Sequence, residues 1–365
     1  MRLFLFAERA RFVRRLRLRG EQRRIALGAI GFATSLVLVL GVASALATPD
    51  QLGQVTESSA GIRLAGSPFL IASGPDGNMW YTDQNWNLIG RVTPAGVITE
   101  YDNATGIPTG IAAGPDGNMW FTEQASDLIG KITASGAVTE YAAGISADSG
   151  PYAIAAGPDG NMWFTEESGN RIGKITSDGV ITEFAAGISP DGGPRGIAAG
   201  PDGNIWFTEN SDRIGKITPS GEVTEYTTGI SPDGVPRGIA AGPDGNIWFT
   251  EYVGGVVGKI TPAGVVTEYS AGIGIGAGPA GIAAGPDGNM WFVEAVGNRI
   301  GRITPAGVVT EYSAGISVGP YGSSFPTGIA SGPDGNIWFT ETCCAALDQS
   351  ISGRIGKIGV ASLDG

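Results

Sequence analysis

The chain has 365 residues, of which 61 are glycine and 22 are proline, and it contains no histidine. Residues 1–47 hold nine of the 23 basic residues and two of the 35 acidic ones, so the remainder carries 14 basic and 33 acidic residues, a net charge of −19. A body this acidic repels phosphate backbones, which argues against nucleic-acid binding.

The N-terminal segment, residues 1–47, has the composition of an export signal or a membrane anchor. Its nine arginines precede an uncharged stretch, 25–47, that ends in an Ala-x-Ala pattern suited to signal peptidase. The same stretch is long enough to span a bilayer as an uncleaved anchor, with the arginines on the cytoplasmic side. Both alternatives predict a segment that enters the membrane at least transiently. Both also predict an extracytoplasmic body, either secreted or membrane-anchored.

A repeat of a little over forty residues follows a short linker, residues 48–54. Its signature is Gly-Pro-Asp-Gly-Asn-x-Trp, and the first glycine of the copies falls at 74, 114, 157, 200, 242, 285 and 332. Each copy has four short apolar runs separated by Asp-Gly or Pro-x-Gly turns, which are typical of hairpins. Four short strands joined by hairpins form one blade of a β-propeller.

The two ends of the repeat array predict how the ring closes. The seventh copy stops after the third strand, Arg354 to Ile358, whereas a spare fourth strand, Val55 to Ser58, precedes the first copy. Pairing the two removes an exposed sheet edge. We therefore predict an all-β fold: a single seven-bladed β-propeller over 55–360 with four-stranded blades. An N-terminal strand completes the last blade, and residues 361–365 form a tail.

Residues that differ between the copies are the best candidates for function. The position after the proline that opens each first strand varies, and the first strand is expected to line the central channel. The seven residues there are Phe69, Thr109, Tyr152, Arg195, Arg237, Ala280 and Thr327.

We single out Phe69, Tyr152, Arg195 and Arg237 as ligand-binding candidates, since guanidinium groups among aromatic rings can bind a carboxylate or a phosphate. The alternative is that both arginines pair with nearby glutamates and only neutralise the rim.

The loops between the second and third strands are expected on the same face. They add Trp86 and Tyr252 to the ligand-binding candidates. In the last blade this loop is expanded and carries Cys343 and Cys344.

An acidic residue ends the second strand in every copy, and a residue repeated seven times is a poor marker of a single active site. We expect these acids to hydrogen-bond at the blade rim and to aid solubility. The weaker alternative is a site for Mg²⁺ or Ca²⁺ at such acids. The candidates for it are Glu166, Glu209 and Glu251.

The Trp-Phe-Thr-Glu, Ile-Gly-Lys-Ile-Thr and Val-Thr-Glu-Tyr blocks resemble the virginiamycin B (streptogramin B) lyase family over roughly residues 55–358. The resemblance implies a seven-bladed propeller. It also implies an enzyme that opens a cyclic depsipeptide antibiotic by elimination, with a histidine base and a magnesium ion near acidic residues. No position in this sequence supplies that histidine, so no catalytic residue is carried over.

We accordingly expect a monomeric binding module that uses the variable face, needs no cofactor, and takes a small molecule or an extracellular protein or peptide at the channel mouth. One alternative is an enzyme of the lyase or lactonase type, acting on a cyclic depsipeptide or lactone with a carboxylate-held divalent metal. Some propeller lactonases hold their metal with Glu, Asn and Asp, so the lack of histidine does not exclude that type. Another alternative is a structural envelope protein.

Overall fold

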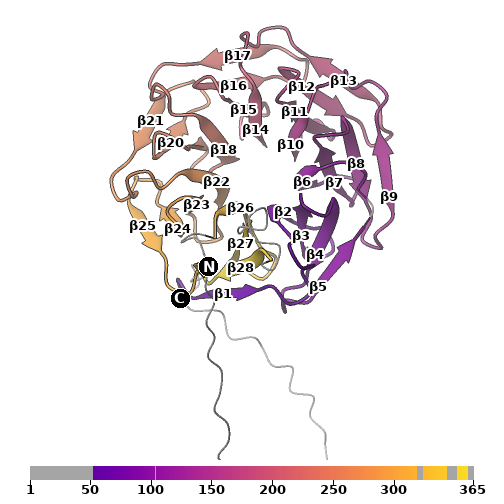
Figure 1. Ribbon diagram of the computed structural model, residues 1–365. Helices are drawn as coiled ribbons and strands as arrows, with labels where there is room; N and C mark the ends of the chain where they lie inside the picture. The colour runs from indigo at the N-terminus through magenta and orange to yellow at the C-terminus, as the bar shows by residue number, and fades with distance from the viewer. Residues whose placement is uncertain (1–51, 103, 319–323, 343–351, 361–365) are drawn as a thin grey trace, which may run out of the picture. The chain divides into compact units, whose positions relative to one another are not determined.

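The structure, a computed structural model, describes residues 52–102, 104–318, 324–342 and 352–360. Over these ranges the chain forms strands and no helix. The strands make seven four-stranded sheets arranged as blades around a central channel (Figure 1). The predicted all-β, seven-bladed propeller is thus confirmed. The segment 1–47 lies outside the described residues. Within the described ranges, no helix is long and apolar enough to span a membrane.

Each blade runs outward from the channel through four antiparallel strands. The inner strands are β2 (Pro68–Ser73), β6 (Pro108–Ala113), β10 (Pro151–Ala156), β14 (Pro194–Ala199), β18 (Pro236–Ala241), β22 (Pro279–Ala284) and β26 (Pro326–Ser331). The second strands are β3 (Met79–Asp83), β7 (Met119–Glu123), β11 (Met162–Glu166), β15 (Ile205–Glu209), β19 (Ile247–Glu251), β23 (Met290–Glu294) and β27 (Ile337–Glu341).

The third and fourth strands complete the blades, numbered 1 to 7 from the blade of β2 to the blade of β26. The third strands are β4 (Leu88–Val92), β8 (Leu128–Ile132), β12 (Arg171–Ile175), β16 (Arg213–Ile217), β20 (Val256–Ile260), β24 (Arg299–Ile303) and β28 (Arg354–Ile358). The outer strands are β5 (Ile98–Tyr101), β9 (Val138–Tyr141), β13 (Ile181–Phe184), β17 (Val223–Tyr226), β21 (Val266–Tyr269), β25 (Val309–Tyr312) and, for blade 7, β1 (Val55–Ser58).

The ring closes as the sequence predicted. Strand β1 pairs antiparallel with β28, with Val55 opposite Ile358 and Ser58 opposite Ile355. Blade 7 therefore joins the two ends of the propeller, and its outer edge is completed by the start of the chain (Figure 1).

The repeat signature builds the turn between the first two strands and anchors its tryptophan. In blade 4, Asp202 accepts hydrogen bonds from the Trp206 indole N–H at 3.0 Å and from the Asn204 amide at 2.9 Å. Trp206 is fully buried and stacks on Tyr226 at 5.6 Å. It shares a buried cluster with Ile247 of the next blade, so the signature holds adjacent blades together.

Candidate functional site

A bulge in each inner strand turns the variable residues toward the channel. In blade 4 the register between β14 and β15 shifts between Pro194 and Ile197, which leaves Arg195 and Gly196 out of the regular pairing. The other six inner strands shift at the same place. Bulges re-aim side chains in this way. The sequence analysis did not predict the bulge, although the glycine that commonly follows the variable residue is a signal for it.

The variable residues surround a cavity of about 130 Å³ at one mouth of the channel. The cavity has apolar walls with two arginines among them, and it brings together four of the six predicted ligand-binding residues. Its lining is Phe69, Leu70, Tyr152, Ala153, Arg195, Gly196, Arg237, Gly238, Ala280, Gly281 and Thr327.

One of the two arginines is already neutralised. The Arg195 guanidinium donates to the Tyr152 hydroxyl at 2.9 Å and to the Glu167 carboxylate at 3.3 Å. Asn210 donates to the same carboxylate oxygen at 2.9 Å and fixes its position. The Tyr152 ring in turn meets Phe69 edge-on at 6.3 Å. For Arg195, the expected alternative of a rim ion pair is therefore what the structure contains.

The other arginine, Arg237, has no carboxylate partner among the described residues. Its guanidinium carbon lies 3.4 Å from the centroid of the Tyr252 ring, a close cation–π contact. Its Nε is buried and makes no hydrogen bond. Burial lowers the pKa of Arg237, and the positive charge of Arg195 lowers it further. The positive charge of Arg237 is only partly compensated by the Tyr252 ring, and an anion in the cavity would neutralise it.

A ring of threonines holds the backbone beneath the variable residues. In blade 4 the buried Thr208 accepts from the Gly196 N–H at 2.8 Å and donates to the Arg237 carbonyl of blade 5 at 2.8 Å. We call this set of paired hydrogen bonds the threonine relay. Blade 6 has Val293 at this position and therefore lacks both bonds. The threonines that make both bonds are Thr82, Thr122, Thr165, Thr208, Thr250 and Thr340.

The acids that end the second strands do not line the cavity, and the expectation that they aid solubility is wrong. All seven are fully buried, because both faces of a second strand are covered and the inner strand separates it from the channel. The seven acids are Asp83, Glu123, Glu166, Glu209, Glu251, Glu294 and Glu341.

The expected hydrogen bonding at the rim is present for some of these acids, since Asp83, Glu123 and Glu341 accept from the adjoining loops. The buried glutamates also lie beside outer-strand glutamates and form carboxyl pairs with them. Burial, and then the charge of Glu225, raises the pKa of Glu209 to about 8. Burial and Glu183 likewise raise the pKa of Glu166 to about 8. Such a pair holds a proton near neutral pH, because two adjacent buried carboxylates repel each other.

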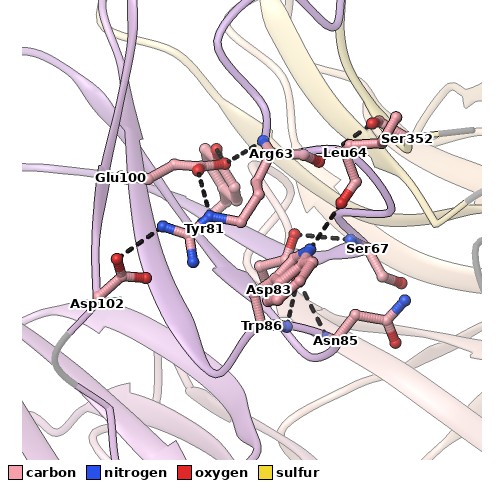
Figure 2. A network of polar contacts seen from close by, with 10 residues as sticks. All are labelled: Arg63, Leu64, Ser67, Tyr81, Asp83, Asn85, Trp86, Glu100, Asp102 and Ser352. Atoms are coloured by element: carbon pink, nitrogen blue, oxygen red, sulfur yellow. Dashed lines mark hydrogen bonds and ion pairs between the residues drawn. The ribbon is translucent and has the colours of Figure 1, made fainter. Parts of the chain in front are cut away.

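Trp86 lies outside the cavity, in a separate network at blade 1 (Figure 2). Its indole N–H donates to the Leu64 carbonyl at 2.9 Å, and the Arg63 guanidinium stacks over its ring at 5.3 Å. Asp83 caps this loop by accepting from the backbone N–H groups of Ser67 and Trp86 at 2.6 and 3.2 Å. Trp86 is 44% exposed but is held by structural contacts of its own. Cys343 and Cys344 lie outside the described residues.

The cavity residues do not fit the magnesium ion that the resemblance implies. None of the lining residues is acidic. Among the residues that the structure describes, no three Asp, Glu or Cys side chains converge on a common point.

Fold and cavity define a seven-bladed β-propeller with a small, arginine-containing pocket at one channel mouth. The model of the virginiamycin B lyase family matches residues 40–189 and 143–319. A streptogramin B lyase structure is 34% identical with a TM-score of 0.75, and the match covers 84% of this chain and 98% of that one.

A catalytically inactive histidine-to-alanine variant of virginiamycin B lyase from Staphylococcus aureus, solved with quinupristin, is 36% identical. That match has a TM-score of 0.75 and covers 84% of this chain and 99% of the other. The chain therefore belongs to the virginiamycin B lyase family. Hydrazine synthase from Kuenenia stuttgartiensis, at 16% identity and a TM-score of 0.63, shares the fold alone. No curated protein matches.

Proposed function

We propose that this protein is an extracytoplasmic binding module that holds a small anionic ligand at the channel mouth and does not open cyclic depsipeptides. The observation that carries the proposal is Arg237, a cation on the cavity wall without a carboxylate partner among the described residues. The rings of Phe69 and Tyr152 on the same cavity favour a ligand with an apolar or aromatic body and one carboxylate or phosphate group.

The absence of histidine supports the loss of lyase chemistry. The S. aureus enzyme with one histidine replaced by alanine is described as catalytically inactive. This chain has no histidine at any position. A general base must reach the proton that it removes. Burial raises the pKa of glutamates such as Glu166 and Glu209 to about 8, but these acids lie behind the inner strands and outside the cavity.

The alternative of a lyase or lactonase with a carboxylate-held metal requires acids at the ligand. The cavity lining contains none, so the geometry favours binding over catalysis. The predicted N-terminal signal or anchor and the acidic body support an extracytoplasmic location.

Calorimetric titration with benzoate, phenyl phosphate and the neutral analogue benzamide tests this function. We expect saturable binding of an anion and none of benzamide. Arg237→Ala should weaken binding about 10- to 100-fold, the range for losing a hydrogen bond to a charged group. Arg63→Gln is the matched control, since Arg63 is an arginine outside the cavity, and it should leave binding unchanged. Equal affinity in Arg237→Ala and the native protein would remove the basis of the proposal.

A further inference from the structure

Blade 5 lacks an arginine that four other blades place beside their buried glutamate pair. In those blades the second strand ends in a glutamate, and the third strand places an arginine opposite it. In blade 4, for example, Arg213 lies opposite Glu209. In blade 5 the residue opposite Glu251 is Val256. The four arginines are Arg171, Arg213, Arg299 and Arg354.

Blade 4 is a near-identical counterpart of blade 5 and shows what the arginine does. The Arg213 guanidinium lies 3.8 Å from the Glu209 carboxylate and 3.7 Å from the Glu225 carboxylate, between the two acids of the pair. The loop that enters blade 4 adds Ser189, whose N–H and hydroxyl both donate to Glu225 at 2.5 Å.

Blade 5 keeps the serine of the entering loop but lacks the cation, and it also lacks a counterpart of Ser211, whose hydroxyl donates to Glu209 at 3.4 Å in blade 4. Ser231 donates its N–H and its hydroxyl to Glu268, both at 2.7 Å. Glu251 is fully buried, and neither of its carboxylate oxygens receives a hydrogen bond.

The other two blades without this arginine replace it by other means. In blade 1, Arg63 lies 3.8 Å from Glu100. In blade 2, Thr105 donates its hydroxyl to Glu123 at 3.0 Å, and the Gly106 N–H donates to the same carboxylate at 2.7 Å. Within the described ranges, Glu251 and Glu268 therefore form the one pair in blades 1 to 7 that has neither an ion pair nor a donor to the inner acid.

Oxygen atoms converge beside this pair. A Cβ atom on Gly234 would lie 2.5 Å from Oε2 of Glu251 and 3.0 Å from the Ser231 carbonyl oxygen, so a side chain here would displace the carboxylate. Carboxylate and carbonyl oxygens, with water, are the ligands of hard divalent cations, and Ca²⁺ accepts irregular sets of them.

We propose that blade 5 binds a Ca²⁺ ion between Glu251 and Glu268, in the place that the Arg213 guanidinium takes in blade 4. The two carboxylates balance its charge, and the Ser231 carbonyl and water complete its shell. The site is separate from the channel mouth, because it shares no residue with the cavity lining.

Calcium titration of the full-length protein, by calorimetry and by thermal unfolding with and without chelator, tests the proposal. We expect saturable binding and a Tm that rises by roughly 5 °C at a large excess of Ca²⁺ over Kd. Glu251→Gln should abolish both effects. Glu294→Gln is its matched control, because Arg299 already neutralises that pair at 3.6 Å, and it should leave both effects intact.

Exchanging the arginine gives a test in both directions. Val256→Arg should abolish Ca²⁺ binding while the protein stays folded, and Arg213→Val should create a second site of the same kind in blade 4. The proposal is wrong if the native protein shows no saturable Ca²⁺ binding, or if binding persists in both Glu251→Gln and Val256→Arg. Since the second exchange gains a site, it remains informative even where one loss-of-site variant fails to fold.

Discussion

The threonine relay makes a stability prediction for which the chain supplies its own control. Thr208→Val keeps the shape of a fully buried side chain but removes its hydroxyl. Two hydrogen bonds of 2.8 Å are lost, and the Gly196 N–H and the Arg237 carbonyl are left without their partner. Each stranded group costs about 1–3 kcal/mol, so for the two together we expect a loss of about 2–6 kcal/mol in the free energy of unfolding.

Urea denaturation measures this loss as a lower midpoint at an unchanged m-value. The reverse exchange in blade 6, Val293→Thr, is the control, since Val293 occupies the equivalent buried position. Its new hydroxyl can bridge the Gly281 N–H and the Thr327 carbonyl, which should stabilise the protein by about 1 kcal/mol. A loss below about 0.5 kcal/mol for Thr208→Val, together with destabilisation by Val293→Thr, would refute the view that the relay holds the blades together.

Three further predictions concern the pairs, the core and the close approach of the inner strands. The raised pKa of Glu209, about 8 against 4.5, means that the folded state binds more protons between these values. The contribution of this group to stability is therefore fully present below pH 4.5 and is lost as the pH rises through 8. Glu209→Gln should flatten the fall in the free energy of unfolding measured from about pH 5 to 9. An unchanged slope would contradict the paired state. Trp206→Ala should cost about 3–5 kcal/mol in the same assay, and a loss below about 1 kcal/mol would place Trp206 outside the core. Gly196→Ala puts a Cβ atom 2.2 Å from the Arg237 carbonyl oxygen, so it should cost about 1–3 kcal/mol and weaken anion binding; native affinity in this variant would show that the inner strands tolerate separation.

The fold could be predicted from the sequence because each of its determinants is local and repeated. The Asp-Gly turns, the tryptophan with its aspartate and the spare strand at Val55 recur or match at fixed spacings. Seven copies average out local ambiguity, and only one ring closure pairs Val55 with Ile358.

The candidate site could be predicted only in part. The position of Arg195 and Arg237 at the channel mouth follows from the repeat, but their different states depend on loop residues. Glu167 reaches Arg195, whereas Tyr252 stacks on Arg237, and sequence spacing does not determine either contact. The acids were misjudged because strand alternation does not reveal that both faces of a second strand are covered.

The sequence already shows that blade 5 has Val256 where four other blades have an arginine. Its meaning required the structure, which shows that Arg213 lies between two carboxylates in blade 4. Internal repeats thus provide matched comparisons within one chain.

Incubation with a streptogramin B antibiotic, followed by mass spectrometry, tests most directly whether this family member binds or cleaves. Ring opening by elimination leaves the mass unchanged, so the linear product must be separated by chromatography and identified from its fragments. With no histidine in the chain and no acid on the cavity wall, we expect the antibiotic to remain cyclic at every protein concentration. Linear product that increases with protein concentration would contradict the proposed function.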